Sequence, residues 1–142
     1  MGLDNAIMAK GRTKAGSDYL EMIKNKFNLE VYDGEYEIAY WRKCWNVRHH
    51  ILDIIAELGC DKERSNEYEF FFGIEVFEEI ADDLKYFLNE DNWENDGNSI
   101  WTWVEMLPCI ADQIRVMRVI LEDIECGVIN AEDLEFRFYD SY

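Results

Sequence analysis

The segment from Ile74 to Asn89 shows the clearest separation of hydrophobic and polar positions in the chain. Its apolar residues recur three and four positions apart, as one face of an α-helix requires, and acidic residues occupy the opposite face. The pattern therefore predicts an amphipathic helix over 74–89. Its apolar face consists of Phe77, Ile80, Ala81, Leu84, Phe87 and Leu88, and its acidic face of Glu75, Glu78, Glu79, Asp82 and Asp83.

Three further segments have the spacing of helices. Apolar residues indicate one helix over 18–27, a second over about 42–58 that Gly59 can end, and a long third helix that continues to about Cys126. Asn98 or Ser99 can cap the long helix, and Pro108 marks either a kink in it or its start. Its expected inward positions are Ile100, Trp103, Leu107, Ile110, Ile114, Met117, Leu121 and Ile124.

Four short segments, near 3–9, 36–41, 67–72 and 134–139, are typical of β-strands. Residues 134–139 alternate strictly between apolar and polar, and Asp33-Gly34 marks a turn before the second strand. Residues 10–17 are expected to form a loop. Because the chain shows neither an internal repeat nor a low-complexity linker, we expect one α+β domain over 1–142. We expect a small antiparallel sheet, covered mainly on one face by three or four helices, with helix as the majority of ordered residues.

The charge is strongly acidic, with 31 Asp and Glu residues against 14 Lys and Arg residues and a formal net charge of −17. Such a field repels nucleic acids and anionic membranes and attracts basic partners. Direct binding of nucleic acid is therefore disfavoured, and a positively charged protein partner is favoured. No apolar run approaches the length of a membrane span, so a membrane association is not expected.

The acidic residues are concentrated in two places. Residues 75–96 hold nine carboxylates against one cation, Lys85: Glu75, Glu78, Glu79, Asp82, Asp83, Glu90, Asp91, Glu94 and Asp96. If fully helical, this segment would extend roughly 33 Å and carry a negative charge about every 3.7 Å, close to the spacing of about 3.4 Å along a DNA strand. The second group, opposed in sequence only by Arg137, is Glu122, Asp123, Glu125, Glu132, Asp133, Glu135 and Asp140. Both groups have two interpretations, a solvated face that keeps the protein soluble or a surface that imitates nucleic acid.

Arg42 and Lys43 stand out as two cations expected in the first turn of a helix, where they oppose the helix dipole. One interpretation is that they pair with neighbouring carboxylates such as Glu37. The other is that they form a small anion pocket together with the helix N-terminus. The neighbouring Tyr40, Trp41 and Trp45 are expected in the core, and only secondarily as a stacking surface.

The remaining candidates for chemistry are weak. His50, Asp53 and Glu57, with His49 beside them, could share a helix face as metal ligands, but no second helix supplies a further histidine, so we expect no metal. We also expect no catalytic residue and no cofactor, because the chain has neither a nucleophile elbow nor a glycine-rich phosphate loop. The four cysteines, Cys44, Cys60, Cys109 and Cys126, are expected to be free core thiols in a reducing cytoplasm, and they could bind zinc only if the fold gathered all four.

Four segments resemble a family of small phage and prophage proteins: Gly2-Leu3-Asp4-Asn5, the run Tyr40-Trp41-Arg42-Lys43-Cys44-Trp45-Asn46-Val47-Arg48, Asn98-Ser99-Ile100-Trp101, and Phe138-Tyr139-Asp140-Ser141-Tyr142. Together they span nearly the whole chain. The family often has histidine where this chain has Arg48, and no function has been agreed for it. The resemblance implies a mobile genetic element and the cytoplasm of a bacterial host.

Charge and resemblance together predict an acidic binding protein encoded by a phage or prophage. Its expected partner is a basic, nucleic-acid-handling host protein such as a defence nuclease, inhibited in the manner of anti-CRISPR and other DNA-mimic proteins. The alternatives are a small phage accessory protein, an enzyme of unknown chemistry or a structural component of the phage. The sequence does not indicate the oligomeric state.

Overall fold

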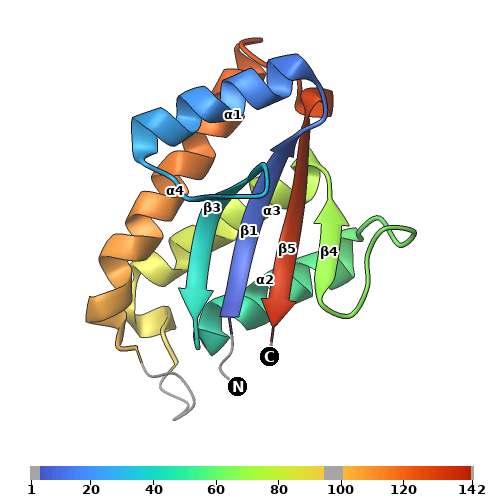
Figure 1. The fold of residues 1–142 in the computed structure, drawn as a ribbon. Helices are drawn as coiled ribbons and strands as arrows, with labels where there is room; N and C mark the ends of the chain where they lie inside the picture. Colours follow the sequence, from blue (N-terminus) through green and yellow to red (C-terminus); the bar gives the residue numbers. More distant parts are fainter. Residues whose placement is uncertain (1–3, 95–100, 142) are drawn as a thin grey trace.

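The computed structural model describes residues 4–94 and 101–141, which form a five-stranded antiparallel sheet with four α-helices (Figure 1). The strands are β1 (Asp4–Gly11), β2 (Val31–Tyr32), β3 (Glu35–Arg42), β4 (Glu69–Phe72) and β5 (Leu134–Ser141), in the spatial order β2-β3-β1-β5-β4. The helices are α1 (Lys14–Phe27), α2 (Trp45–Leu58), α3 (Ile74–Leu84) and α4 (Trp103–Glu125), with 3₁₀ turns η1 (Lys85–Leu88), η2 (Glu90–Asn92) and η3 (Ala131–Asp133). The α+β class, the antiparallel sheet, the long helix and the predominance of helix are confirmed.

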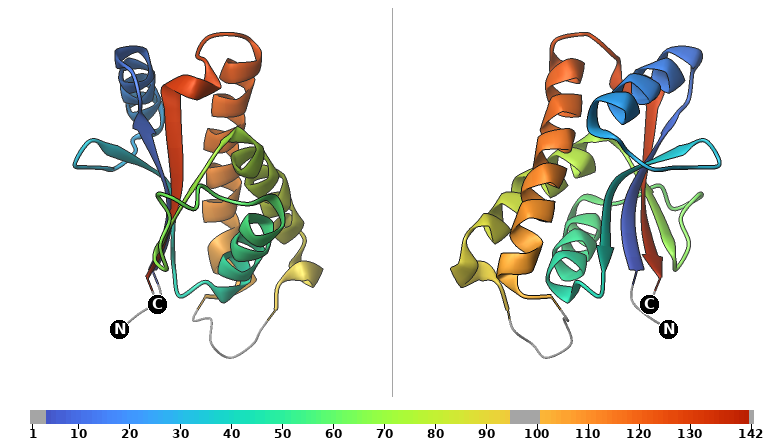
Figure 2. Two further views of the ribbon diagram at one scale, coloured as in Figure 1. Left: turned by 90° about the vertical axis from the view of Figure 1, so that its right-hand side faces the viewer. Right: turned by 60° about the vertical axis from the view of Figure 1, so that its left-hand side comes forward.

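Helices α2, α3 and α4 lie together on one face of the sheet, whereas α1 lies at the end of the sheet near the β2–β3 hairpin (Figure 2). The hydroxyl of Tyr19 on α1 donates to Asp123 on α4 at 2.7 Å, so the two helices also contact each other. Buried side chains from the sheet and all four α-helices form one hydrophobic cluster. The prediction that the helices cover mainly one face of the sheet is therefore confirmed for α2, α3 and α4.

Local sequence explains the hairpin between β2 and β3, and β3 carries a bulge farther along. Asp33 and Gly34 both have positive φ, as a two-residue hairpin turn of type I′ requires. This turn pairs β3 with β2, a two-residue strand that the sequence pattern did not reveal. Farther along β3, the register with β1 shifts at Ile7/Met8, so Ile38 is an extra residue and both Ile38 and Ala39 are buried.

The free edge of β3 is covered rather than open. The side-chain amide of Gln113 on α4 donates to the carbonyl of Tyr40 at 3.2 Å, and the indole N–H of Trp101 donates to the carbonyl of Arg42 at 2.6 Å. These bonds satisfy two acceptors that a bare edge strand would offer to another chain. The long helix therefore protects this edge of the sheet.

Several predicted boundaries were wrong. Helix α1 begins at Lys14, inside the expected loop, because Thr13 caps it by accepting from the amide of Gly16 at 3.1 Å. Helix α3 ends at Leu84 and continues as the 3₁₀ turn η1, which rotates Leu88 to the surface, where 42% of it is exposed.

The start of α4 also differs from the prediction. Thr102 caps the helix and forms a reciprocal capping box with Glu105, and Pro108 lies inside the helix rather than at its start. The expected caps Asn98 and Ser99, and the expected core residue Ile100, lie outside the described residues. None of the described helices combines the length and apolar character that crossing a membrane requires.

Two expectations about core residues need correction. Cys44 is buried, but Cys60 is only half-buried, and Cys109 and Cys126 are exposed, so the cysteines are not a set of core thiols. Trp41 is buried as expected, whereas Tyr40 lies on the opposite face of β3 and is exposed, and Trp45 is only partly buried.

Candidate functional site

The acidic face of α3, which consists of Glu75, Glu78, Glu79, Asp82 and Asp83, lies on the side of the helix away from the core. Its first four members are exposed and Asp83 is partly exposed, while Val76, Phe77, Ile80, Ala81 and Leu84 on the other side are buried. The periodicity of the sequence thus identified this face correctly. The nine-carboxylate segment is not one straight rod, however, because α3 ends at Leu84.

The few basic side chains near the acidic face lie at one end of it. Lys85 and Arg118 each reach Asp82 at 3.5 Å, and Nδ1 of His50 lies 3.6 Å from Asp83. Among the described residues, no ion pair reaches Glu75, Glu78 or Glu79, nor Glu90, Asp91 and Glu94 beyond the helix. The ninth carboxylate, Asp96, lies outside the described residues.

The second acidic group is partly neutralised within the fold. Asp140 is buried and paired with Arg48, and Glu135 forms a bidentate pair with Arg64 at 2.6 and 2.8 Å. The Arg64 guanidinium holds the pKa of the Glu135 carboxyl below its ordinary value. Arg137, the only cation that opposes this group in the sequence, pairs instead with Glu35 and Glu69, and cations from distant parts of the chain neutralise Asp140 and Glu135. Glu122, Glu125 and Glu132 remain exposed.

Arg42 and Lys43 do not lie in a helix, so the premise of the anion-pocket hypothesis is wrong. Arg42 ends β3, Lys43 has a φ of 50°, and α2 begins only at Trp45, without a side-chain cap. Within the described segments, no carboxylate forms an ion pair with either cation, and the expected pairing with Glu37 is absent. Binding of an anion by these two residues stays a prediction.

The two histidines line a cavity of about 260 Å³ between α2 and the turns η1 and η2. Asp53 also lines this cavity, together with Tyr86 and Glu94, but Glu57 does not. Residues 4–94 and 101–141 contain no group of three His, Cys, Asp or Glu side chains that could hold a metal. The possible metal ligands named in the sequence are therefore not gathered in one site, because Glu57 lies outside the cavity that His50 and Asp53 line.

A buried polar cluster, which was not predicted from the sequence, lies at the opposite end of the sheet from α1. The amide of Asn5 on β1 donates to Asp140 on β5 at 2.6 Å, and Arg48 on α2 donates to both carboxylate oxygens at 2.8 and 2.9 Å. Asn5 is 1% exposed and Asp140 is 2% exposed. A signal was present, because Asp140 is in phase with the apolar Phe136 and Phe138 and so had to face the core.

This cluster joins three of the four segments that carry the phage-family resemblance. Asn5, Arg48 and Asp140 each come from a different one of those segments. From the fourth segment, Trp101 is described, and it bonds to Arg42 at the adjacent end of β3. The segments that stand out in the sequence thus meet around one end of the sheet.

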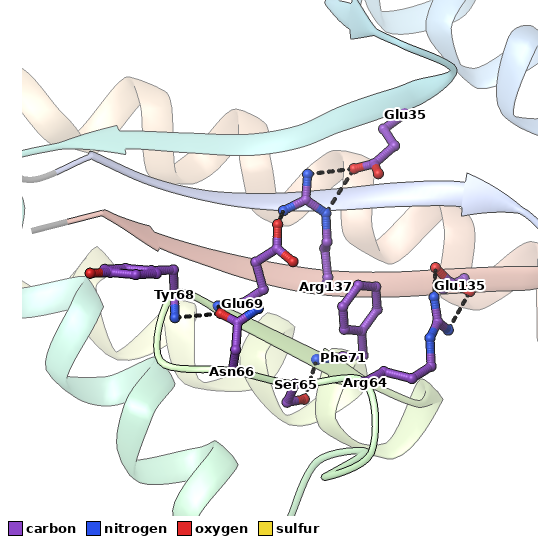
Figure 3. A network of polar contacts seen from close by, with 9 residues as sticks. All are labelled: Glu35, Arg64, Ser65, Asn66, Tyr68, Glu69, Phe71, Glu135 and Arg137. Carbon is purple, nitrogen blue, oxygen red and sulfur yellow. Dashed lines mark hydrogen bonds and ion pairs between the residues drawn. The ribbon is translucent and has the colours of Figure 1, made fainter.

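The sheet face opposite α2, α3 and α4 carries polar side chains that pair with one another. The guanidinium of Arg137 on β5 lies between Glu35 of β3 and Glu69 of β4, at 2.7 and 3.0 Å (Figure 3). The hydroxyl of Tyr40 donates to Asp4 at 2.7 Å, which raises the pKa of Tyr40 to about 12. These charges are already satisfied within the fold, so this face offers less to a partner than the acidic face of α3.

Comparisons with known proteins leave the resemblance as a hypothesis. The chain matches no protein-family model, and no curated protein or solved structure matches it significantly.

Proposed function

We propose that this chain is a phage- or prophage-encoded acidic protein of the bacterial cytoplasm that binds a basic, nucleic-acid-handling host protein through the acidic face of α3. The observation that carries the proposal is the row of exposed carboxylates Glu75, Glu78 and Glu79, which no cation in the described structure neutralises. A nuclease of host defence fits this description, because its groove must be basic to hold nucleic acid.

The spacing of the charges supports this partner. Glu75, Glu78, Glu79 and Asp82 occupy positions i, i+3, i+4 and i+7, so they span roughly 10.5 Å of helix axis and follow one another about every 3.5 Å on average. Phosphates along one DNA strand repeat about every 3.4 Å. A groove lined with Lys and Arg for phosphate could therefore accept this row of carboxylates in its place.

The acidic face also has an energetic cost that a partner would relieve. It contains five like-charged pairs at i, i+3 or i, i+4: 75/78, 75/79, 78/82, 79/82 and 79/83. At about 0.2–0.5 kcal/mol each, the repulsion amounts to roughly 1–2.5 kcal/mol in the free protein. A basic partner would convert this repulsion into attraction, and association should be fast at low salt and weaker at high salt.

A matched pair of charge-reversal variants tests the proposal. The double variant Glu78→Lys/Glu79→Lys removes charge from the acidic face, and Asp82 and Asp83 stay because they contact other side chains. The control Glu122→Lys/Glu125→Lys makes the same change in net charge near the end of α4, also on exposed residues. Each immobilised protein captures partners from a bacterial lysate, and a salt gradient elutes them.

We expect the wild type and the control to capture the same basic proteins, and the α3 variant to lose them. A short DNA duplex should displace the captured proteins, because the acidic face and DNA would occupy the same groove. Equal capture by both variants, or capture that DNA does not affect, would contradict the proposal. Thermal unfolding of each variant, followed by circular dichroism, checks that the fold is retained.

A further inference from the structure

The cavity between α2 and the turns η1 and η2 lies directly beside the acidic face of α3. His50 connects the two, because its Nδ1 lies 3.6 Å from Asp83 of the acidic face while its ring lines the cavity. A partner that covers the acidic face as far as Asp83 would therefore reach the edge of this cavity.

Aromatic residues line part of this mostly polar cavity. The ring of His50 lies 5.1 Å from that of Tyr86 and 4.7 Å from that of Phe87, measured between centroids, and Trp45 lines the same space. Phe87 is 1% exposed and gives the wall a fixed base, whereas Tyr86 is 48% exposed and presents its ring to solvent. Aromatic faces carry partial negative charge and attract cations.

The charged side chains of the cavity have one sign. Asp53 and Glu94 line it, and no Lys or Arg of the described chain does. The position of Glu94 is held by Asn46, whose side-chain amide exchanges two hydrogen bonds with the Glu94 backbone, both at 3.0 Å. An aromatic wall with carboxylates beside it is complementary to a planar cation.

The protein's own arginines show which cation such a site suits. Arg64 lies 4.2 Å over the ring of Phe71 while it forms its bidentate pair with Glu135 (Figure 3). Arg48 likewise lies 5.2 Å over the ring of Trp45 while it binds Asp140 through two nitrogens. In both cases a guanidinium stacks on a ring and pairs with a carboxylate. The cavity offers the same two elements at Tyr86 and Asp53, whereas the ring of Trp45 is already stacked against Arg48.

We infer that this cavity receives an arginine side chain of the basic partner, an inference that rests on the function proposed above. A guanidinium can stack on the exposed ring of Tyr86 through its face and bind Asp53 or Glu94 through its edge. Lysine has a compact, strongly hydrated ammonium that does neither as well. The cavity thus adds selectivity for arginine to the general attraction of the acidic face.

Titration with small arginine derivatives, followed by NMR, tests the inference without a partner protein. The probes are N-acetyl-arginine amide, its lysine counterpart, and the uncharged citrulline counterpart, which has nearly the shape of arginine. We expect saturable shifts of the Trp45 indole signal and of the His50 and Tyr86 amides with the arginine probe. The lysine probe should bind at least about fivefold more weakly, a difference of roughly 1 kcal/mol, and the citrulline probe should cause no saturable shift.

Variants then locate the binding. Asp53→Asn and Tyr86→Ala should each weaken arginine binding at least about fivefold. Their matched controls should leave it unchanged: Glu57→Gln, which neutralises a carboxylate on the same helix outside this cavity, and Tyr32→Ala, which removes another exposed tyrosine. Equal binding of arginine and citrulline, or unchanged binding by both cavity variants, would overturn the inference.

The same variants separate this inference from the proposed function. If Glu78→Lys/Glu79→Lys loses the captured proteins while Asp53→Asn and Tyr86→Ala keep them at full affinity, the acidic face is functional and the arginine pocket is wrong. If the arginine probe binds the cavity but neither charge-reversal variant affects capture, the pocket stands and the proposed function fails.

Discussion

Replacing Arg48 with methionine tests how much the buried cluster at the end of the sheet contributes to stability. In the native protein, the Arg48 guanidinium donates two hydrogen bonds to Asp140, which is 2% exposed, and its own side chain is 15% exposed. Methionine keeps much of the apolar length of the side chain but removes the charge and both bonds. Among the described side chains, Asp140 then keeps one donor, the amide of Asn5.

The expected loss is large because one charge stays buried without its counterion. Removing one partner of a buried pair costs about 3–5 kcal/mol, a substantial part of the roughly 5–15 kcal/mol that stabilises a typical domain. The reverse change, Asp140→Asn, should cost less, about 1.5–3 kcal/mol, because the guanidinium can turn toward solvent from its less buried position. The double variant Arg48→Met/Asp140→Leu should recover about 1 kcal/mol or more relative to Arg48→Met, since it leaves no unpaired charge.

Urea unfolding followed by far-ultraviolet circular dichroism measures these differences in the free energy of unfolding. Lys14→Met is the control, because the Lys14–Asp18 pair is on the surface, with exposed fractions of 88% and 65%, and its loss should leave the free energy of unfolding nearly unchanged. The reasoning fails if Arg48→Met costs less than about 1 kcal/mol, or if the double variant is less stable than Arg48→Met.

Three further changes test local features of the fold. Gly16→Ala should lower stability by about 1–3 kcal/mol, because a Cβ there would meet the backbone carbonyl of Asp133. A higher melting temperature would contradict this and show that α1 can move away from the segment around Asp133. Thr102→Ala should cost about 1 kcal/mol in urea unfolding, because it breaks the capping box with Glu105, and an unchanged midpoint would indicate that packing alone positions α4. Burial raises the pKa of Glu37, so the native state binds its proton more tightly and ionisation costs stability as the pH rises. Glu37→Gln should therefore raise the melting temperature at neutral pH but not at about pH 3, where both side chains are neutral; an equal gain at both pH values would contradict this explanation.

The sequence predicted the fold class well because hydrophobic periodicity reports directly on burial. The alternation in 134–139 places Phe136 and Phe138 in the core, and the helical spacing over 74–84 separates the buried and acidic sides of α3. Boundaries were less predictable where apolar residues continue from a strand into a helix. Trp41 closes the buried face of β3 and Trp45 opens α2, and the N-cap between them, Cys44, makes no capping bond that would have marked the change.

The features of the candidate site also differ in how far the sequence predicts them. The acidic face of α3 was predictable, because all its residues lie on one helix. The neutralisation of the second acidic group was not, since Arg48 reaches Asp140 across 92 positions and Arg64 reaches Glu135 across 71. The arginine cavity was also beyond prediction, because it requires the position of η1 and η2 against α2.

The place of β5 in the sheet has a consequence for the newly made chain. This strand lies between β1 and β4, pairs with β1 along its whole length and with β4 over residues 136–139, and is β4's single neighbour in the described sheet. On the ribosome, β1 is made first but must wait for residues 134–141 before its second neighbour exists. Closing a loop of this length is costly in entropy, and the unpaired strands stay exposed to aggregation meanwhile. The sheet therefore completes only after nearly the whole described chain has been synthesised, and the bond between Asn5 and Asp140, 135 positions apart, is among the last to form.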